Sequence, residues 1–258
     1  MYMKPAVSTL HLLDRPLEEA FAPLLELGIP RWEVADSGYH ALNPKRVERL
    51  QSIKADYGVE FSVHAPYSDT NLSADDDLIR EWILKRLRAS IRFASELGGR
   101  YLVVHPGWSP PTERFHRGRA WRTNLRSLHW LLRYAGEYGV ECLMENVPNP
   151  TPYLLVTLDD FLLFHEEMNP PMGYVLDVAH AHLLGEELDF IEALGPHIRH
   201  VHVSDNHGQS DDHLPLGEGD INWPRVLDAL DDQGYQGWLV VESYTGVGES
   251  IEFLESLL

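Results

Sequence analysis

The stretch His197-Ile-Arg-His-Val-His-Val-Ser-Asp-Asn-His-Gly-Gln-Ser-Asp-Asp-His-Leu-Pro-Leu-Gly-Glu-Gly-Asp-Ile221 changes character halfway along its length. Its first part has the apolar pattern of a β-strand, and its second part is a polar loop rich in side chains that bind metals. His202 lies near the predicted strand end. A loop closed by glycine could fold back and present Asp211 and His213 to the same centre. A solvated acidic turn is the alternative interpretation, because short motifs of this kind also occur by chance.

Similar strands alternate with helical stripes along the rest of the chain. The pattern predicts strands at 3–10, 29–34, 59–64, 101–105, 140–145, 173–177, 200–204 and 238–242. It predicts helices at 17–27, 44–57, 78–97, 121–138, 157–167, 186–194, 222–233 and 250–258, with an irregular loop at 107–119. A glycine separates a helical stripe from the next strand at six places: Gly28, Gly58, Gly98, Gly139, Gly195 and Gly234. This recurrence indicates a repeated unit of one strand and one helix.

Eight such alternations in 258 residues are typical of an α/β fold, the (β/α)8 TIM barrel, and predict a single domain over residues 1–258. A doubly wound open sheet is the alternative, but its glycine-rich fingerprint after the first strand is absent. Hydrophobic residues make up 44% of the chain, which is enough for a sizeable core.

Charge and composition narrow the classes of function. The formal net charge is −19, which disfavours non-specific binding to nucleic acid without excluding it, and favours a small-molecule substrate. No basic segment leads into an apolar run and no apolar run approaches 18 residues, so we expect a cytoplasmic protein that does not enter a membrane. Cys142 is the single cysteine and lies in an apolar run, which predicts a buried, inert thiol.

Six consecutive predicted strands, the third to the eighth, end in a residue that can bind a metal ion. These residues are His64, His105, Glu145, Asp177, His202 and Glu242, at intervals of 41, 40, 32, 25 and 40 residues. Any one of them alone is more simply an ordinary loop residue. A closed sheet would bring all six to one mouth, where unpaired carboxylates repel each other unless cations hold them.

Three further candidates lie in the loops: His180, Asp211 and His213. Nine nitrogen and oxygen ligands exceed the four to six that one zinc or manganese ion takes, so the sequence predicts two or three divalent ions per chain, with zinc expected and manganese possible.

The motifs around these residues resemble the xylose isomerase-like barrel superfamily, which unites endonuclease IV-type apurinic-site endonucleases with sugar isomerases and epimerases. The matching segments are Val63-His64, Val104-His105-Pro106, Met144-Glu145-Asn146, Leu176-Asp177-Val-Ala-His180, His202, Asp211-Asp-His213-Leu-Pro-Leu-Gly217-Glu-Gly219 and Val241-Glu242. The resemblance implies one ion on His64, His105 and a bridging Glu145, and a second on Glu145, Asp177, His202 and Glu242. It implies a third on His180, Asp211 and His213. The second set matches the single-metal site of the isomerases.

Two features depart from the endonuclease pattern. Asp212 stands where the endonucleases usually carry a basic residue, and the acidic chain has little room for long DNA-reading loops. A local basic segment with Trp108, Arg114 and Arg117 follows the fourth strand; it is either an ordinary charged surface or a clamp for a substrate phosphate.

The leading hypothesis is therefore a metal-dependent phosphoesterase with a multinuclear, zinc-type site that hydrolyses a phosphate ester in a small molecule, with Glu145 and Glu242 as catalytic residues. The alternative is a metal-dependent sugar or sugar phosphate isomerase or epimerase, in which the same two carboxylates move a proton. An apurinic-site DNA endonuclease is the third hypothesis, and a binding protein that kept a metal for stability is the fourth. The sequence predicts no oligomeric state.

Overall fold

Eight parallel strands close into a barrel in this computed structural model, which describes residues 3–258. The strands pair in chain order and β1 closes the ring by pairing with β8. They are β1 Lys4–Ser8, β2 Arg31–Ala35, β3 Glu60–His64, β4 Tyr101–Val104, β5 Glu141–Glu145, β6 Gly173–Asp177, β7 Ile198–Val203 and β8 Trp238–Val241. The predicted (β/α)8 TIM barrel is confirmed, and the open sheet is excluded.

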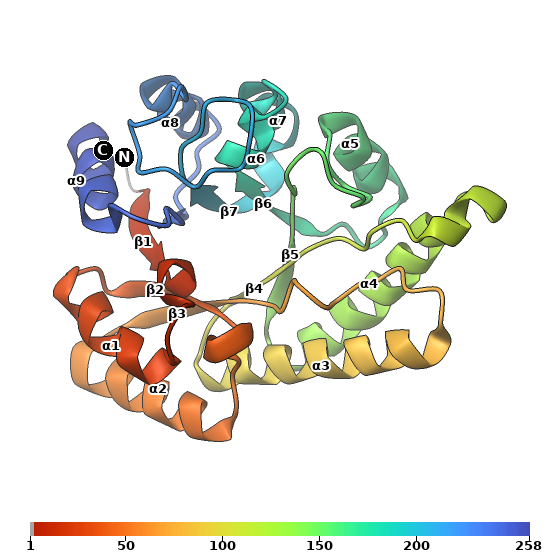
Figure 1. Cartoon of the computed structure of the whole chain (residues 1–258), viewed down its shortest axis with the longest axis horizontal. Helices are drawn as coiled ribbons and strands as arrows, with labels where there is room; N and C mark the ends of the chain where they lie inside the picture. The colour runs from red at the N-terminus through yellow and green to blue at the C-terminus, as the bar shows by residue number, and fades with distance from the viewer. Residues whose placement is uncertain (1–2) are drawn as a thin grey trace.

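Helices surround the strands on the outside of the ring (Figure 1). They are α1 Leu17–Glu26, α2 Pro44–Tyr57, α3 Asp77–Glu96, α4 Arg119–Glu137, α5 Leu158–Glu167, α6 Val178–His182, α7 Glu187–Leu194, α8 Trp223–Asp232 and α9 Val247–Leu257. Four 3-10 helices join them: η1 Thr9–Leu12, η2 Gly38–His40, η3 Pro111–Phe115 and η4 Gly195–His197. Within residues 3–258, no helix combines the length and the apolar composition that crossing a membrane requires.

Local chemistry explains several element boundaries. At the start of α5, Thr157 accepts a hydrogen bond from the Asp160 amide while the Asp160 side chain accepts one from Thr157, a reciprocal cap that the sequence predicts. Gly58 ends α2 at φ 70°, where a side chain would be strained. The first strand stops at Ser8 rather than at residue 10, because the Ser8 hydroxyl accepts a hydrogen bond from Leu10 and starts η1.

Three further differences from the sequence expectations concern helices. The five-residue α6, which begins directly at the end of β6, is not predicted from the sequence. The last helix begins at Val247, three residues before the expected start. The segment expected to be an irregular loop contains η3.

Alternation along the strands divides the apolar side chains into two sets. On β4, Leu102 and Val104 belong to the large core between strands and helices, whereas Val103 packs with Leu143 and Val175 in a separate small cluster inside the barrel. Cys142 is buried, and burial raises the pKa of its thiol to about 12, in agreement with the expected inert cysteine. Towards the carboxyl ends of the strands, buried polar residues such as Glu33, Glu145 and His202 join these apolar side chains.

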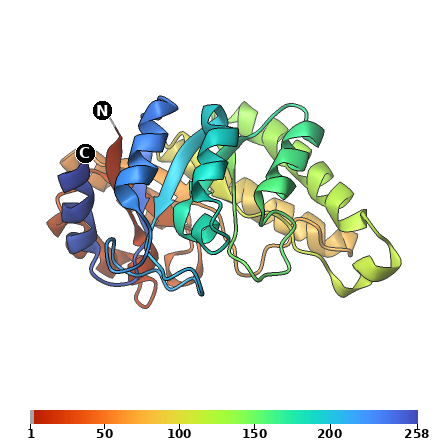
Figure 2. The same cartoon turned by 90° about the horizontal axis from the view of Figure 1, so that it is seen from above.

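The connections that follow the strands collect at one end of the barrel. Figure 2 shows the blue loop after β7 and the green segment after β5 along the same edge of the molecule. This is the end at which parallel barrels carry their active sites.

Candidate metal centre

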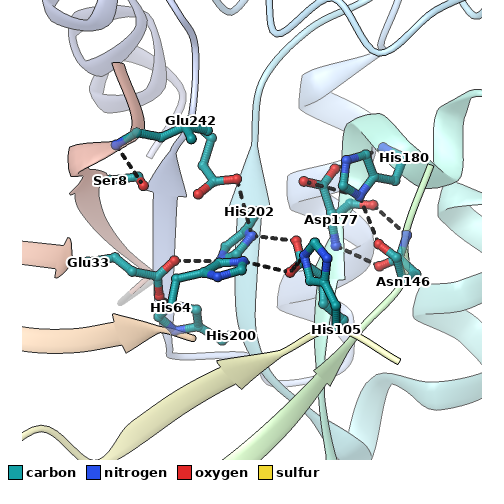
Figure 3. Close-up of polar contacts among 12 residues, drawn as sticks. Ser8, Glu33, His64, His105, Asn146, Asp177, His180, His200, His202 and Glu242 are labelled. Carbon is teal, nitrogen blue, oxygen red and sulfur yellow. Dashed lines mark hydrogen bonds and ion pairs between the residues drawn. The ribbon is translucent and has the colours of Figure 1, made fainter. Parts of the chain in front are cut away.

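The strand ends deliver the six predicted rim residues to one place. His64, Glu145 and Asp177 are the last residues of their strands, and His202 is one residue from the end of β7. His105 and Glu242 directly follow β4 and β8. Figure 3 shows the side chains of His64, His105, Asp177, His202 and Glu242 converging from different strands, with His180 beside Asp177.

The first group, which we call the central cluster, comprises Glu145, Asp177, His202 and Glu242. One ligand atom from each lies within 4.8 Å of the others, and all four residues are buried. Asp177 and His202 are direct register partners in β6 and β7, which places their side chains next to each other. Nδ1 of His202 lies 2.8 Å from Glu145 Oε1 and 3.4 Å from Glu242 Oε2.

The central cluster has the chemistry of a cation site. It gathers three carboxylates away from water, where unneutralised negative charge is costly. Burial raises the pKa of Asp177 to about 6, and its Oδ2 atom has no hydrogen-bond partner among the described residues. One imidazole and three carboxylates are a suitable ligand set for zinc or manganese, so the residues present fit a divalent ion.

The second group, the lateral cluster, comprises His64, His105 and Glu145. Nε2 of His64 and Nε2 of His105 lie 3.1 Å and 2.9 Å from the same carboxylate oxygen, Glu145 Oε2. Nδ1 of His64 lies 2.8 Å from the carbonyl oxygen of Ala65, to which it can donate its proton, so that Nε2 faces the cluster. Burial lowers the pKa of His64, but the contact with Glu145 outweighs this and raises it to about 9.

The third group, the loop cluster, comprises His180, Asp211 and His213. Both imidazoles direct Nδ1 to a backbone carbonyl oxygen at 2.8 Å, that of Asn146 for His180 and that of Glu242 for His213. Their Nε2 atoms each lie 3.3 Å from Asp211 Oδ2. Backbone carbonyls thus fix both rings so that the second nitrogen of each faces one carboxylate, an arrangement typical of histidine metal ligands.

Electrostatics in the loop cluster follow from this geometry. Burial lowers the pKa values of His180 and His213, but nearby carboxylates outweigh it and raise them to about 10 and about 9. Burial raises the pKa of Asp211, but hydrogen bonds from the two histidines lower it overall. In the absence of a metal ion, the two imidazoles therefore hold protons near neutral pH.

The loop after β7 is tightly held at His213. His213 is the one non-glycine residue with positive φ, 47°, among residues 3–258. Its carbonyl oxygen accepts a hydrogen bond from the Tyr244 amide, and its ring stacks on that of Tyr244 with centroids 4.4 Å apart. The neighbouring residue Leu214 exchanges two backbone hydrogen bonds with Asp205. A strained residue held in this way is common at functional sites.

The three clusters border one cavity of about 230 Å³. It is lined by Leu10, Ala35, His64, Tyr67, His105, Glu145, Pro148, Tyr153, His180, Asp211, His213, Glu242 and Tyr244. Within residues 3–258, this lining includes neither lysine nor arginine. Tyr67 and Tyr153 place their rings 5.6 Å and 5.8 Å from that of His105, so aromatic surface lies next to the ligands.

The nine predicted ligands therefore all fall into the three clusters, whereas the three predicted substrate-binding residues lie outside the cavity lining. Trp108 forms a backbone bridge with Tyr153, and the Arg114 guanidinium stacks on Phe115. Arg117 is exposed in the loop before α4. A substrate contact of these residues stays a prediction, and the cavity gives it no support.

Sequence reasoning misses several residues around the site. Glu33 and His200 form a further group with His202 inside the barrel. Asn146 holds Asp177, because its side chain bonds the Asp177 amide at 2.8 Å and the Asp177 carbonyl at 2.9 Å. His200 could have been found from its position two residues before His202, since residues two apart on a strand share a face. Glu33 could have been found as the one charge between two apolar strand residues.

Comparison with known proteins identifies a protein family that matches most of the chain. Residues 21–257 match the family model described as xylose isomerase-like TIM barrel. An uncharacterised protein of Methanocaldococcus jannaschii is 33% identical over 245 residues, covering 93% of this chain and 84% of that protein. The crystal structure of a D-tagatose 3-epimerase-like protein superposes with a TM-score of 0.93 at 31% identity, covering 99% of this chain and 97% of that one.

A relative with a named activity is the fructoselysine 3-epimerase of Shigella flexneri, 24% identical over 258 residues that cover 94% of this chain and 91% of that protein. Proteins described as probable endonuclease 4 also match. The relatives thus include both groups of proteins that the sequence resembles, the sugar epimerases and the endonucleases. The named epimerases favour the isomerase or epimerase hypothesis over the leading phosphoesterase hypothesis, which the relatives do not support.

Proposed function

The chain belongs to the xylose isomerase-like TIM barrel family, and from this premise we propose that it is a metal-dependent epimerase acting on a small, unphosphorylated sugar. The observation that carries the proposal is the central cluster, in which Glu145 and Glu242 both approach Nδ1 of His202. Two carboxylates beside one cation site are what proton transfer next to a sugar carbonyl requires. The epimerase relatives support the same reaction class.

The four residues of the central cluster would hold the divalent ion. When bound, the ion acts as a Lewis acid that draws electrons from adjacent sugar oxygens and so acidifies the neighbouring C–H bond. His202 supplies the nitrogen ligand, and Asp177 supplies a carboxylate held in place by Asn146. Glu145 and Glu242 complete the set and reach the cavity.

The chain's own carboxylates would move the proton. One of the pair Glu145 and Glu242 removes the proton from the carbon beside the carbonyl, which leaves a planar enediolate of the sugar. The other, in its protonated form, gives a proton to the opposite face of that carbon. One C–H bond breaks and one forms, nothing is oxidised overall, and the configuration inverts. Burial raises the pKa of Glu145, but the histidines outweigh it and hold this pKa well below its usual range, so this carboxylate is ionised.

The cavity lining favours a neutral substrate. A phosphate group normally pairs with arginine, lysine or backbone amides, and the described lining residues include no cationic lysine or arginine. The tyrosines at Tyr67, Tyr153 and Tyr244 offer hydroxyl groups and ring faces, which suit the hydroxyl groups and C–H surface of a sugar.

The test is exchange of a carbon-bound proton with solvent. The protein is loaded with Mn²⁺, Zn²⁺ or Co²⁺ and incubated in D₂O with D-fructose, D-tagatose or D-psicose, and the sugars are followed by NMR. The proposal expects deuterium at the carbon next to the carbonyl together with the epimeric sugar. Glu187→Gln is a matched control, because Glu187 lies on α7 and does not line the cavity. Exchange in the control and none in Glu242→Gln supports the proposal; no exchange with any sugar and metal contradicts it.

A hydrolase remains a second candidate because of one observation. The lateral and loop clusters provide five potential ligands beyond the central cluster: His64, His105, His180, Asp211 and His213. An epimerase that uses one metal ion leaves these five residues without a metal-binding role. Two or three ions side by side would suit hydrolysis of a phosphate ester. Three bound ions per chain and phosphate release from model phosphomonoesters or phosphodiesters would favour this candidate; one ion per chain and no release would exclude it.

A further inference from the structure

Glu33 is a fully buried carboxylate that neither the proposed reaction nor the cavity uses. It lies in the middle of β2, its relative exposure is 0%, and it faces the barrel interior beneath the central cluster. Its register partner on β3 is Ser62, and the two histidines His200 and His202 approach it from β7. A buried carboxylate is costly unless its contacts compensate for lost hydration, so the arrangement of those contacts is informative.

The two oxygens of Glu33 have different partners. Oε2 accepts a hydrogen bond from the Ser62 hydroxyl at 2.9 Å and lies 2.8 Å from Nε2 of His200. Oε1 lies 2.9 Å from Nε2 of His202, at an angle outside the range of a hydrogen bond. Ser62 and His200 thus hold one oxygen and leave the other facing His202. Figure 3 shows Glu33 reaching the His202 ring from the β2 side.

The two ring nitrogens of His202 therefore have different neighbours, which determines which of them carries the proton. Nδ1 faces the carboxylates of the central cluster, Glu145 at 2.8 Å and Glu242 at 3.4 Å. A neutral imidazole has one lone pair and one N–H, so a ring that ligates through Nδ1 carries its proton on Nε2. That N–H lies in the barrel interior, where relative exposure of His202 is 0%, and Glu33 is the acceptor beside it.

We infer that Glu33 is a positioning residue for His202: when Nδ1 of His202 holds an ion, Glu33 Oε1 is the acceptor in place for a hydrogen bond from Nε2–H, which fixes the tautomer with Nδ1 free and increases the basicity of the ligand. Ser62 and His200 in turn orient Glu33. This inference rests on the proposed function only in that His202 is a metal ligand, and it is independent of the sugar. Carboxylates that accept from ligating histidines commonly contribute 10-fold to 100-fold in metal affinity.

The same residues allow a different occupant. Glu33, His200 and His202 offer three ligand atoms within 4.8 Å of one another, which is a possible site for another ion. The Ser62 hydroxyl and His200 already contact Glu33 Oε2 at hydrogen-bond distance, which leaves one carboxylate oxygen of Glu33 for an ion. These contacts favour the positioning role, and a metal count separates the two.

The test compares Zn²⁺ and Co²⁺ binding to the metal-free full-length protein and to Glu33→Gln by isothermal titration, together with the visible absorption of bound Co²⁺. The amide keeps the shape of the side chain and removes its charge. We expect affinity at the central cluster to fall about 10-fold to 100-fold. The Co²⁺ spectrum should change and the number of bound ions should stay the same. Equal affinity in the two proteins, or one ion fewer in the variant, overturns the inference.

Two companion variants keep the result interpretable. Asp36→Asn is the matched control, since Asp36 is also a fully buried carboxylate, but it pairs with Arg86 and Ser90 rather than with a ligand. It should lower Tm without changing metal affinity. Ser62→Ala removes one neutral hydrogen bond to Glu33 and serves if Glu33→Gln does not fold; we expect affinity to fall severalfold, and unchanged affinity overturns the inference. Absence of metal binding in the wild type would refute the proposed function together with this inference. Wild-type binding that is weaker in Glu33→Gln and in Ser62→Ala, but unchanged in Asp36→Asn, upholds the inference.

Discussion

Glu145 Oε1 lies 2.8 Å from Nδ1 of His202, while the other oxygen of the same carboxylate faces His64 and His105. One buried carboxylate thus joins the central and lateral clusters. Its position at the last residue of β5 makes this possible, because the ends of β3, β4 and β7 bring the three imidazoles to it. Glu145 is therefore a candidate ligand in both clusters and one of the two carboxylates proposed to transfer the proton.

Glu145→Gln should therefore abolish proton exchange. Loss of a general base commonly costs about 10²-fold to 10⁴-fold in rate, and this variant also removes a ligand. Solvent deuterium incorporation into the sugar measures the effect, and metal titration of the same variant should show weaker binding. Exchange in Glu145→Gln at the rate of the wild type would show that Glu145 does not take part in the proton transfer.

Stability of the metal-free protein should fall as pH rises above neutral. The folded-state pKa values of His64 and His213 are about 9 and that of His180 is about 10, all raised from 6.5. Groups with raised values stabilise the fold fully below pH 6.5, and this contribution is lost as pH rises through 9 to 10. Urea unfolding of the chelator-treated protein at pH 6.5 and pH 9.5 checks the sign.

The control for the pH experiment separates the site from general charge repulsion. His213→Gln should show a smaller loss of stability between the two pH values, whereas the exposed His207→Gln should behave like the wild type. Stability that rises with pH, or an equal slope in all three proteins, would contradict the assigned shifts.

Metal binding should stabilise the fold. An ion present at about 100 times its Kd stabilises the folded state by about 2.7 kcal/mol. Tm should therefore rise by several degrees on adding Zn²⁺ or Mn²⁺ to the metal-free protein. Calorimetry with and without a chelator measures the shift, and a Tm that does not respond to any divalent ion would speak against a metal centre.

The loop after β7 should tolerate no side chain at position 219. A Cβ on Gly219 would collide with the backbone of Asn206 and with Asp205, the buried carboxylate that accepts from Gly217 and Trp223. Gly219→Ala should therefore lower Tm and weaken metal binding at the loop cluster. Gly136→Ala is a control, because neither Gly136 nor Gly219 has a positive φ and the carbon added at Gly136 meets open space. Identical metal binding in both variants would show that the loop packing does not support the cluster.

Much of this architecture can be predicted from the sequence, because the carboxyl ends of parallel strands all lie at the same end of the barrel. His64, Asp177 and Glu242 are recognisable as strand-end residues, and the closed ring then dictates that they meet. Asp211 and His213 are proposed from the residue types in the loop that follows the seventh strand, and the structure places them together with His180.

Other features cannot be predicted without the structure. The pairing of Glu33 with His200 is one of them, because the two residues are 167 positions apart and neither strand carries a local signal of its partner. The short α6 has too few residues for a periodic pattern. The basic residues Arg114 and Arg117 suggest a phosphate clamp in sequence, but neither of them lines the cavity.

The central claim is that Glu145 and Glu242 transfer a proton to and from a sugar at a metal site. The most direct test is deuterium incorporation from D₂O into D-fructose, D-tagatose or D-psicose by the metal-loaded protein, followed by NMR. The account predicts deuterium at the carbon beside the carbonyl, with the epimer formed, and loss of both in Glu242→Gln. No incorporation with any of these sugars, alongside release of phosphate from phosphoester probes, would contradict it.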